Sequence, residues 1–270
     1  MLKFLSAQAA EIISEVRYLA GSHYPWFVTR PCPEWTLNQI PVFTYHGVEP
    51  AGFNRELRFL ADNGYQTITA RDFYSFLTLT RDALGKEVLL TFDDGYKTVW
   101  TEGAPLLKQY KFRAIAFIVP GYVGQPGYLT WGDIKQMRES GLFDIQSHTM
   151  NHNAGICSTA TNIPAIEYEL SESKRQIEEH LPGHCVEHLC YPEGLGSRPA
   201  AEISRRLGYK TNFWSMRLDR ALNRPGDDPY KIVRLKHDYI LRLPGVGRRA
   251  MVSIFGEKAL RRIKGKSFEF

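Results

Sequence analysis

The stretch EVLLTFDDGYKTVW (residues 87–100) decides the fold, because it joins a strand to an acidic pair at a single point of the chain. Its first six residues are typical of a β-strand that is buried on both faces. Asp93 and Asp94 follow directly, and Gly95 supplies the positive φ that a turn needs. An active site on a parallel sheet belongs at this point, beyond the carboxyl end of a strand.

A second polar cluster, SHTMNH (residues 147–152), follows the apolar run at residues 143–145. His148 and His152 stand four positions apart, so their side chains project the same way and suit a shared metal ion. Taken singly, the acidic doublet is also an ordinary turn, and the His spacing is a frequent accident in a chain with eight His. The combination of the two clusters is much harder to attribute to chance.

Short apolar runs alternate with helical patterns along most of the chain. The expected strands lie at residues 42–45, 87–92, 114–119, 143–147, 188–190 and 232–235. Repeated strand-then-helix order implies a parallel sheet with right-handed crossovers, and about seven such units favour a barrel over an open sheet. We therefore expect an α/β fold, specifically a distorted (β/α)7-type barrel.

Several polar residues fall within a few positions after expected strands, and a barrel would bring all those strand ends together on one face. These residues are His46, Asp93, Asp94, His148, Glu193 and His237.

The chain resembles the NodB-type polysaccharide deacetylases of carbohydrate esterase family 4, in the branch of the poly-N-acetylglucosamine deacetylases. The resemblance covers about three quarters of the chain and implies the NodB homology fold. It is carried by PVFTYHGV, FNRELRFLADNGYQTIT, LLTFDDGYKTVW, LTWGDIKQMRESGLFDIQSHTMNH, YPEG and IVRLKH.

The resemblance implies one divalent metal ion, bound by Asp94, His148 and His152. One carboxylate and two imidazoles form a mixed oxygen and nitrogen ligand set, for which we expect zinc. Such an ion lowers the pKa of a bound water toward ~7 and polarises a carbonyl. Asp93 is then free to act as the catalytic base, because successive side chains leave the backbone in different directions.

Two histidines are candidates for the general acid that protonates the leaving amine. We expect His237, in LKH, to hold this role, with His46 in TYHGV as the alternative. The backbone N–H of Glu193, within the turn YPEG, is implied as the donor to the oxyanion, and Tyr191, which begins this turn, is a further candidate substrate contact. Trp131 begins a segment whose Thr130 and Asp133 fit a capping box, and its ring could also wall the sugar site.

The chain departs from the broad family pattern at two positions. Cys190 stands where many members carry an arginine that steadies the base, and Glu193 stands where many carry an aromatic residue. Arg234, at the end of another expected strand, could form the missing ion pair with Asp93. Glu193 could favour a substrate that bears a positive charge, or could point to solvent.

The chain has 270 residues and a net charge of +5, and it divides into three predicted parts. Residues 1–40 form an amphipathic helix and an irregular wrap, 41–240 the catalytic domain, and 241–270 a basic tail. Basic residues are concentrated in residues 231–270, with eleven Lys or Arg against three Asp or Glu. That tail could meet an anionic membrane surface, although a solvated terminal helix explains it as well. No pattern indicates nucleic-acid binding.

The location and the oligomeric state are less constrained. We see neither a signal peptide nor a membrane-spanning run, and the four cysteines lack the paired spacing of a disulfide scaffold, so we expect a cytoplasmic protein, with peripheral membrane contact as a further hypothesis. Members of the family that this chain resembles are commonly exported. It therefore stays open whether an export signal was removed from the chain. The sequence does not indicate the oligomeric state.

The resemblance implies that the chain hydrolyses N-acetyl groups on amino sugars of a polysaccharide, an oligosaccharide or a lipid-linked precursor. Two alternatives stay open. The same metal site could act on another amide or an ester, and a chain whose site has decayed could bind sugar without catalysis.

Overall fold

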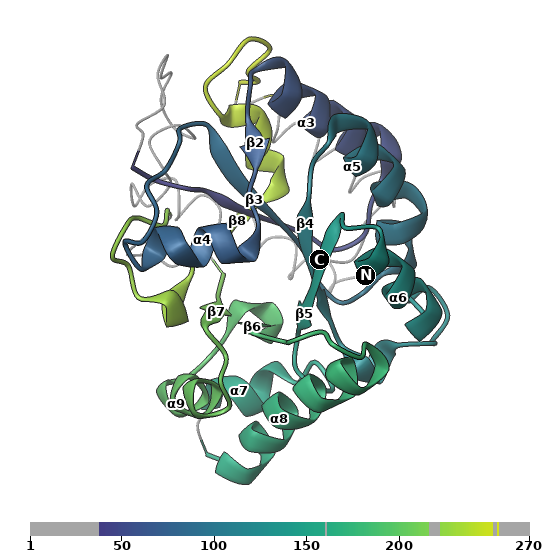
Figure 1. Cartoon of the computed structure of the whole chain (residues 1–270), viewed down its shortest axis with the longest axis vertical. Helices are drawn as coiled ribbons and strands as arrows, with labels where there is room; N and C mark the ends of the chain where they lie inside the picture. Colours follow the sequence, from purple (N-terminus) through teal and green to yellow (C-terminus); the bar gives the residue numbers. More distant parts are fainter. Residues whose placement is uncertain (1–37, 160, 216–221, 251–252, 254–270) are drawn as a thin grey trace, which may run out of the picture.

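The computed structural model describes residues 38–159, 161–215, 222–250 and 253. The predicted N-terminal helix lies outside the described residues, and so does most of the predicted basic tail. In the described part, a curled parallel sheet forms the centre of the molecule and helices surround it (Figure 1). None of the described helices combines the length and the apolar character that crossing a bilayer requires.

The sheet contains eight strands within the described residues, in the order β7-β6-β5-β4-β3-β1-β8, and β2 pairs with β3 off this path. Every pairing between these strands is parallel. The strands are β1 (Val42–Tyr45), β2 (Gln66–Thr67), β3 (Glu87–Phe92), β4 (Ala114–Ile118), β5 (Phe143–Ser147), β6 (His188–Cys190), β7 (Thr211–Phe213) and β8 (Leu235–Lys236).

The two edges of the sheet meet at Ile232. Its N–H donates to the carbonyl of Asn212 at 3.0 Å, and its carbonyl accepts from the N–H of Trp214 at 2.7 Å. The chain then enters β8, which pairs with β1 at the other edge. The sheet therefore curls into the distorted barrel that the alternation of strands and helices predicts, and the carboxyl ends of its strands face one opening.

Helices cover the outside of the curled sheet. Figure 1 shows α7, α8 and α9 grouped beside β5 to β7, and α3 and α5 together on another side. The α-helices are α3 (Pro50–Asp62), α4 (Ala70–Leu77), α5 (Ala104–Tyr110), α6 (Trp131–Glu139), α7 (Ala154–Thr159), α8 (Ile163–His180) and α9 (Arg198–Arg206). The short helical turns are η1 (Val99–Gly103), η2 (Pro120–Tyr122), η3 (Pro192–Gly194), η4 (Pro229–Lys231) and η5 (His237–Arg242).

Alternate strand residues face opposite sides of the sheet and fill two separate cores. The inner core fills the barrel, and Phe73 and Phe76 of α4 belong to it. The outer core lies between the sheet and the surrounding helices. Leu89 of β3 faces inward and Leu90 outward, so the alternation brings Thr91 and then Asp93 to the barrel interior.

The predicted strands at residues 42–45, 87–92, 143–147 and 188–190 have the predicted bounds. The capping box at the start of α6 is confirmed. Thr130 Oγ1 accepts from the Asp133 N–H at 3.2 Å, and Asp133 Oδ2 accepts from the Thr130 N–H at 2.8 Å. The strands β2 and β7 were not predicted, since two or three residues carry too little periodic signal.

Candidate metal centre

The three predicted metal ligands converge at the carboxyl ends of β3 and β5. Asp94 Oδ1 lies 3.3 Å from Nε2 of His148 and 3.3 Å from Nε2 of His152. One potential ligand atom from each residue lies within 4.8 Å of the other two. The spacing is close enough for all three side chains to bind one ion.

The chemistry of these donors fits a divalent cation. Asp94 Oδ1 is buried and has no hydrogen-bond partner among the described residues, although two ring nitrogens face it. A bound cation would satisfy this oxygen, whose burial would otherwise be costly. The Nδ1 atom of His148 lies 2.9 Å from the carbonyl of Cys190, which orients the ring and leaves Nε2 to face the site.

The electrostatic field of the site favours positive charge. Burial would lower the pKa of His148, but neighbouring Cys190 and Asp93 and the contact with Asp94 outweigh it, so the pKa is raised well above its ordinary value. Burial would raise the pKa of Asp94, yet His148 lowers it overall. A carboxylate held ionised in a buried place is the setting in which a metal ion binds.

Strained backbone aims the ligands. Asp94, Thr149 and His152 all have positive φ, at 70°, 64° and 56°. Few residues other than glycine adopt this region, and the β-branched Thr149 is especially unfavourable there. Such strain costs on the order of 1–3 kcal/mol per residue and persists only where the surroundings enforce it.

Two contacts hold the loop that carries both His ligands. Glu169 of α8 is buried and accepts from Asn151 twice, with Oε2 2.8 Å from its N–H and Oε1 3.0 Å from its side-chain amide. On the other side, the Gly121 N–H donates to the carbonyl of Met150 at 2.9 Å. A Cβ at Gly121 would stand 2.8 Å from that oxygen, so only glycine fits this approach.

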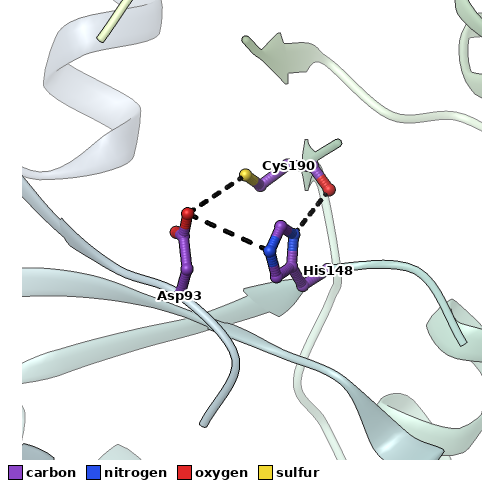
Figure 2. Close-up of side chains that lie close together, drawn as sticks. All are labelled: Asp93, His148 and Cys190. Atoms are coloured by element: carbon purple, nitrogen blue, oxygen red, sulfur yellow. Dashed lines mark hydrogen bonds and ion pairs between the residues drawn. The ribbon is translucent and has the colours of Figure 1, made fainter. Parts of the chain in front are cut away.

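Asp93 lies beside the ligand cluster but is held by other partners. Its Oδ1 accepts from Arg234 Nη1 at 2.7 Å. Its Oδ2 accepts from Thr44 Oγ1 at 3.3 Å and from the thiol of Cys190 at 3.8 Å. Figure 2 shows Asp93, His148 and Cys190 turned toward one another, with Oδ2 of Asp93 3.9 Å from His148 Nε2.

Burial by itself would raise the pKa of Asp93. The charge of Arg234, followed by those of neighbouring His148 and His46, outweighs burial and lowers this pKa well below its ordinary range. Asp93 is therefore ionised at neutral pH. The predicted pairing of Arg234 with Asp93 is present in the structure, while the hydroxyl of Thr44 is a partner that sequence reasoning missed.

The two candidate general acids occupy different places. His46 follows β1 and is close enough to the acidic doublet for both carboxylates to act on its pKa, which burial lowers more than they raise it. His237 follows β8, with Nδ1 3.0 Å from Glu56 Oε1 and its ring stacked on Tyr45 at 4.5 Å between centroids. The buried Glu56 is a partner that the sequence did not indicate.

The predicted substrate contacts differ in exposure. Glu193 is exposed in η3 and has a φ of 54°, and its charge acts on the pKa of His152, so it borders the metal centre. The side chain of Tyr191 is fully buried, and its hydroxyl accepts from Asn212 at 2.8 Å, so it does not face a substrate. The ring of Trp131 stacks on His180 at 3.9 Å, and its contact with sugar stays a prediction.

The fold and the donor set define an α/β-barrel protein with a buried carboxylate–imidazole cation site, the kind of centre found in metal-dependent hydrolases. The sequence profile described as polysaccharide deacetylase matches residues 80–212. The chain therefore contains a polysaccharide deacetylase domain.

Relatives and solved structures agree with this assignment. The Bacillus subtilis (strain 168) protein YxkH, assigned to the polysaccharide deacetylases, is 27% identical over 180 residues, which cover 64% of this chain and 63% of that protein. The poly-beta-1,6-N-acetyl-D-glucosamine N-deacetylase of Staphylococcus aureus (strain MSSA476) is 23% identical over 199 residues, or 70% of this chain and 67% of the relative. The chain thus spans about two thirds of the length of these curated relatives.

Among solved structures, IcaB from Ammonifex degensii superimposes with a TM-score of 0.69 and 26% identity over 78% of this chain and 98% of that one. The Streptococcus pyogenes deacetylase PplD, solved in complex with acetate, has a TM-score of 0.66 and 23% identity over 74% of this chain and 93% of that one. The likeness to PplD, at 23% identity, supports the fold alone.

Proposed function

We propose that the chain hydrolyses the N-acetyl groups of N-acetylated amino sugars in a polysaccharide or oligosaccharide, with one zinc ion as cofactor. A single observation carries this proposal. Asp94, His148 and His152 converge on one buried point, and Asp93 lies beside them in an ionised state. The naming of the staphylococcal relative as a poly-N-acetylglucosamine deacetylase supports the choice of substrate class.

A zinc ion held by the three ligands supplies Lewis acidity, because it lowers the pKa of a water molecule and polarises the acetyl carbonyl. The protein's own groups then perform the proton transfers. Asp93 takes the proton of the attacking water at Oδ2, because Oδ1 is engaged by Arg234 at 2.7 Å. Thr44 and Cys190 also donate to Oδ2, and they hold the carboxylate in one orientation.

The oxyanion that forms at the acetyl carbonyl needs a fixed donor. We assign this role to the backbone N–H of Glu193, because the N–H groups of the next two residues of its turn, Gly194 and Leu195, donate to the carbonyls of Tyr191 and Pro192. A donor of this kind contributes about 3 kcal/mol to the transition state.

The leaving amine needs a proton before the C–N bond breaks. We assign this step to His46, because it lies near both members of the acidic doublet. His237 is the alternative, since Glu56 would orient its ring.

Acetate release from β-1,6-linked N-acetylglucosamine oligomers tests the proposed function. We expect release that chelators abolish and that zinc restores. Replacing Asp93 by Asn should abolish turnover while zinc content stays unchanged, since Asp93 is not a ligand. Asp62→Asn, at an exposed carboxylate on α3, is the matched control and should keep full activity.

Three outcomes would contradict the proposal. Retained turnover in Asp93→Asn would show that Asp93 is not the base. Turnover of aryl acetates or cyclic imides, without turnover of any acetylated oligosaccharide, would keep the metal site but replace the substrate. No turnover with any divalent ion would indicate a sugar-binding protein that has lost catalysis.

Location and membrane contact are separate proposals. We propose a cytoplasmic location and a peripheral attachment to an anionic membrane through the basic residues 231–270. Both proposals rest on the sequence. Pelleting with anionic vesicles tests the attachment, and a chain that stays in the supernatant at low salt would remove it.

A further inference from the structure

A group of three tyrosines lies next to the metal centre. The ring of Tyr122 is 5.9 Å from the ring of the ligand His152, measured between centroids. Tyr128 follows at 4.9 Å from Tyr122, and Tyr96 at 4.9 Å from Tyr128. Each of the three side chains is partly exposed. We call these three residues the tyrosine wall.

The tyrosine wall is built on fixed backbone. Residues 119–129 follow β4, and their start is pinned to the loop of His ligands through the Gly121–Met150 hydrogen bond described above. Their end is pinned to the segment after the acidic doublet, because Leu129 donates to the carbonyl of Gly95 at 2.9 Å and Tyr128 forms an antiparallel bridge with Tyr96. The rings therefore keep their position relative to the metal ligands.

Two hydroxyls of the wall differ from those of six other tyrosines. Within the described part of the chain, the hydroxyls of Tyr122 and Tyr128 have no hydrogen-bond partner. The hydroxyls of the six others bond to protein atoms at 2.7–2.8 Å. Those tyrosines are Tyr45, Tyr65, Tyr110, Tyr191, Tyr209 and Tyr230. Tyrosine offers an apolar ring together with a polar tip, and at a binding surface both parts serve a ligand.

The position of the tyrosine wall indicates the chemical class of ligand that it would contact. The phenolic hydroxyl of Tyr122 can both donate and accept a hydrogen bond. The wall begins beside His152 and extends from it through Tyr122 and Tyr128 to Tyr96. A ligand along it must have apolar ring faces and many hydroxyl groups, which is the chemistry of a sugar chain.

On the basis of the proposed function, we propose that the tyrosine wall binds the sugar units next to the one that is deacetylated. Tyr122 and Tyr128 pack against pyranose faces and hydrogen-bond to their hydroxyls, and Tyr96 supports Tyr128 from behind. The chain thus acts on internal units of an extended glycan, and its affinity rises with the length of the glycan.

Binding in the Asp93→Asn chain tests the wall without consuming the ligand. The probes are β-1,6-linked N-acetylglucosamine oligomers from monomer to pentamer, with Kd measured by calorimetry. We expect Tyr122→Ala and Tyr128→Ala each to raise the Kd of the pentamer on the order of tenfold and to leave the monomer unchanged. Tyr128→Phe should raise the Kd of the pentamer by less than Tyr128→Ala does, because the aromatic ring remains.

Tyr74→Ala is the matched control, since Tyr74 is a partly buried tyrosine on α4, the helix that belongs to the inner core at the other end of the barrel. It should leave every Kd unchanged. Far-UV circular dichroism and a thermal melt establish that each variant is folded. Pentamer affinity that is unchanged in both alanine variants would overturn the proposal, and so would a parent chain that binds monomer and pentamer equally.

Acetate release from the chain with Asp93 intact separates this proposal from the proposed function. Release that rises with oligomer length in the parent, but not in Tyr128→Ala, supports both. Release with a length dependence that the tyrosine variants leave unaltered refutes the wall alone. Length-dependent binding without any acetate release refutes the proposed function and keeps the wall.

Discussion

Arg234 and Asp93 form a buried ion pair across 141 positions of the sequence, with Nη1 2.7 Å from Oδ1. The two side chains are 4% and 3% exposed. Removing two charges from water is expensive, and only close geometry offsets the cost. The pair is therefore better understood as a device that keeps the base ionised and oriented than as a source of stability.

Replacing Arg234 by Met should leave Asp93 as an unpaired buried charge. We expect a loss of about 3–5 kcal/mol in the free energy of unfolding. Adding Asp93→Asn should restore part of this stability without restoring activity, which urea unfolding and acetate release would measure. Arg198→Met, at an exposed arginine on α9, should change neither quantity. Equal stability of the single and double variants would contradict the coupling.

The same substitution should change the pH dependence of activity. Arg234 lowers the pKa of Asp93, and the base must be ionised to accept a proton. Without Arg234 this pKa rises, so the acidic limb of the activity profile should move to higher pH. For stability, the depressed pKa means that the contribution of Asp93 is present above its unfolded value of about 3.9 and is lost as pH falls through the folded one.

Glu169 should control metal affinity without touching the ion, because it holds the backbone of Asn151 between the two His ligands. In Glu169→Gln, one oxygen becomes an amide donor that faces a donor on Asn151. We expect zinc affinity, measured by competition with a chelator, to fall by roughly 10–100-fold. Glu179→Gln, at an exposed glutamate on the same helix, should bind zinc normally. Unchanged affinity in Glu169→Gln would rule out this role.

His46 and His237 can be distinguished by the leaving group. If His46 protonates the leaving amine, His46→Asn should lower kcat on oligosaccharides by roughly 10²–10⁴-fold. The phenolate that is released from an aryl acetate leaves without a proton. The same variant should therefore retain most of its activity on that substrate. His237→Asn, which loses the contact with Glu56, should affect both substrates alike. The reverse pattern would assign the acid to His237.

His188 should make stability depend on acidity. Burial lowers its pKa to about 4, and Nδ1 lies 2.7 Å from Thr211 Oγ1. Since the unfolded value is about 6.5, the unfolded chain binds more protons between these two pH values, and stability rises with pH across that window. At pH 5 the loss should be roughly 2 kcal/mol relative to pH 8.

Urea unfolding of His188→Asn at pH 5 and pH 8 would measure this contribution, because asparagine keeps a polar group near Thr211 but does not titrate. The difference in the free energy of unfolding between pH 5 and pH 8 should shrink by roughly 2 kcal/mol. His180→Asn, at an exposed imidazole, should leave the difference as it is in the parent chain. A parent and a His188→Asn chain with equal pH dependence would show that His188 is not responsible.

Local patterns were sufficient for four strands, β1, β3, β5 and β6, and for the positions of the candidate metal ligands. Residues 87–92 and 143–147 are strands because continuous apolar runs suit a sheet buried on both faces. The positions of Asp94, His148 and His152 after those strands follow from the same runs, so their convergence was predictable. Arg234 was predictable only in part, because the absence of an arginine at Cys190 called for a substitute from another strand.

Contacts between distant segments could not be predicted in this way. Nothing in the sequence around Thr44 or Glu169 marks either as a partner of the site, since both belong to ordinary strand and helix patterns. The closure of the sheet at Ile232 and the pairing of β8 with β1 set where Arg234, just before β8, lies relative to Asp93 after β3. A one-residue change in that register would turn Arg234 away from Asp93.

The sequence by itself indicated which side chains are the candidate metal ligands and base, because the motifs that carry them resemble those of a known family and their positions after strands are local properties. Only the tertiary structure decided that Thr44 and Cys190, together with Arg234, contact Asp93, that Glu169 holds the loop of the two histidines, and that both carboxylates of the acidic doublet act on His46. These relationships depend on how the barrel closes, which is a property of all its strands together.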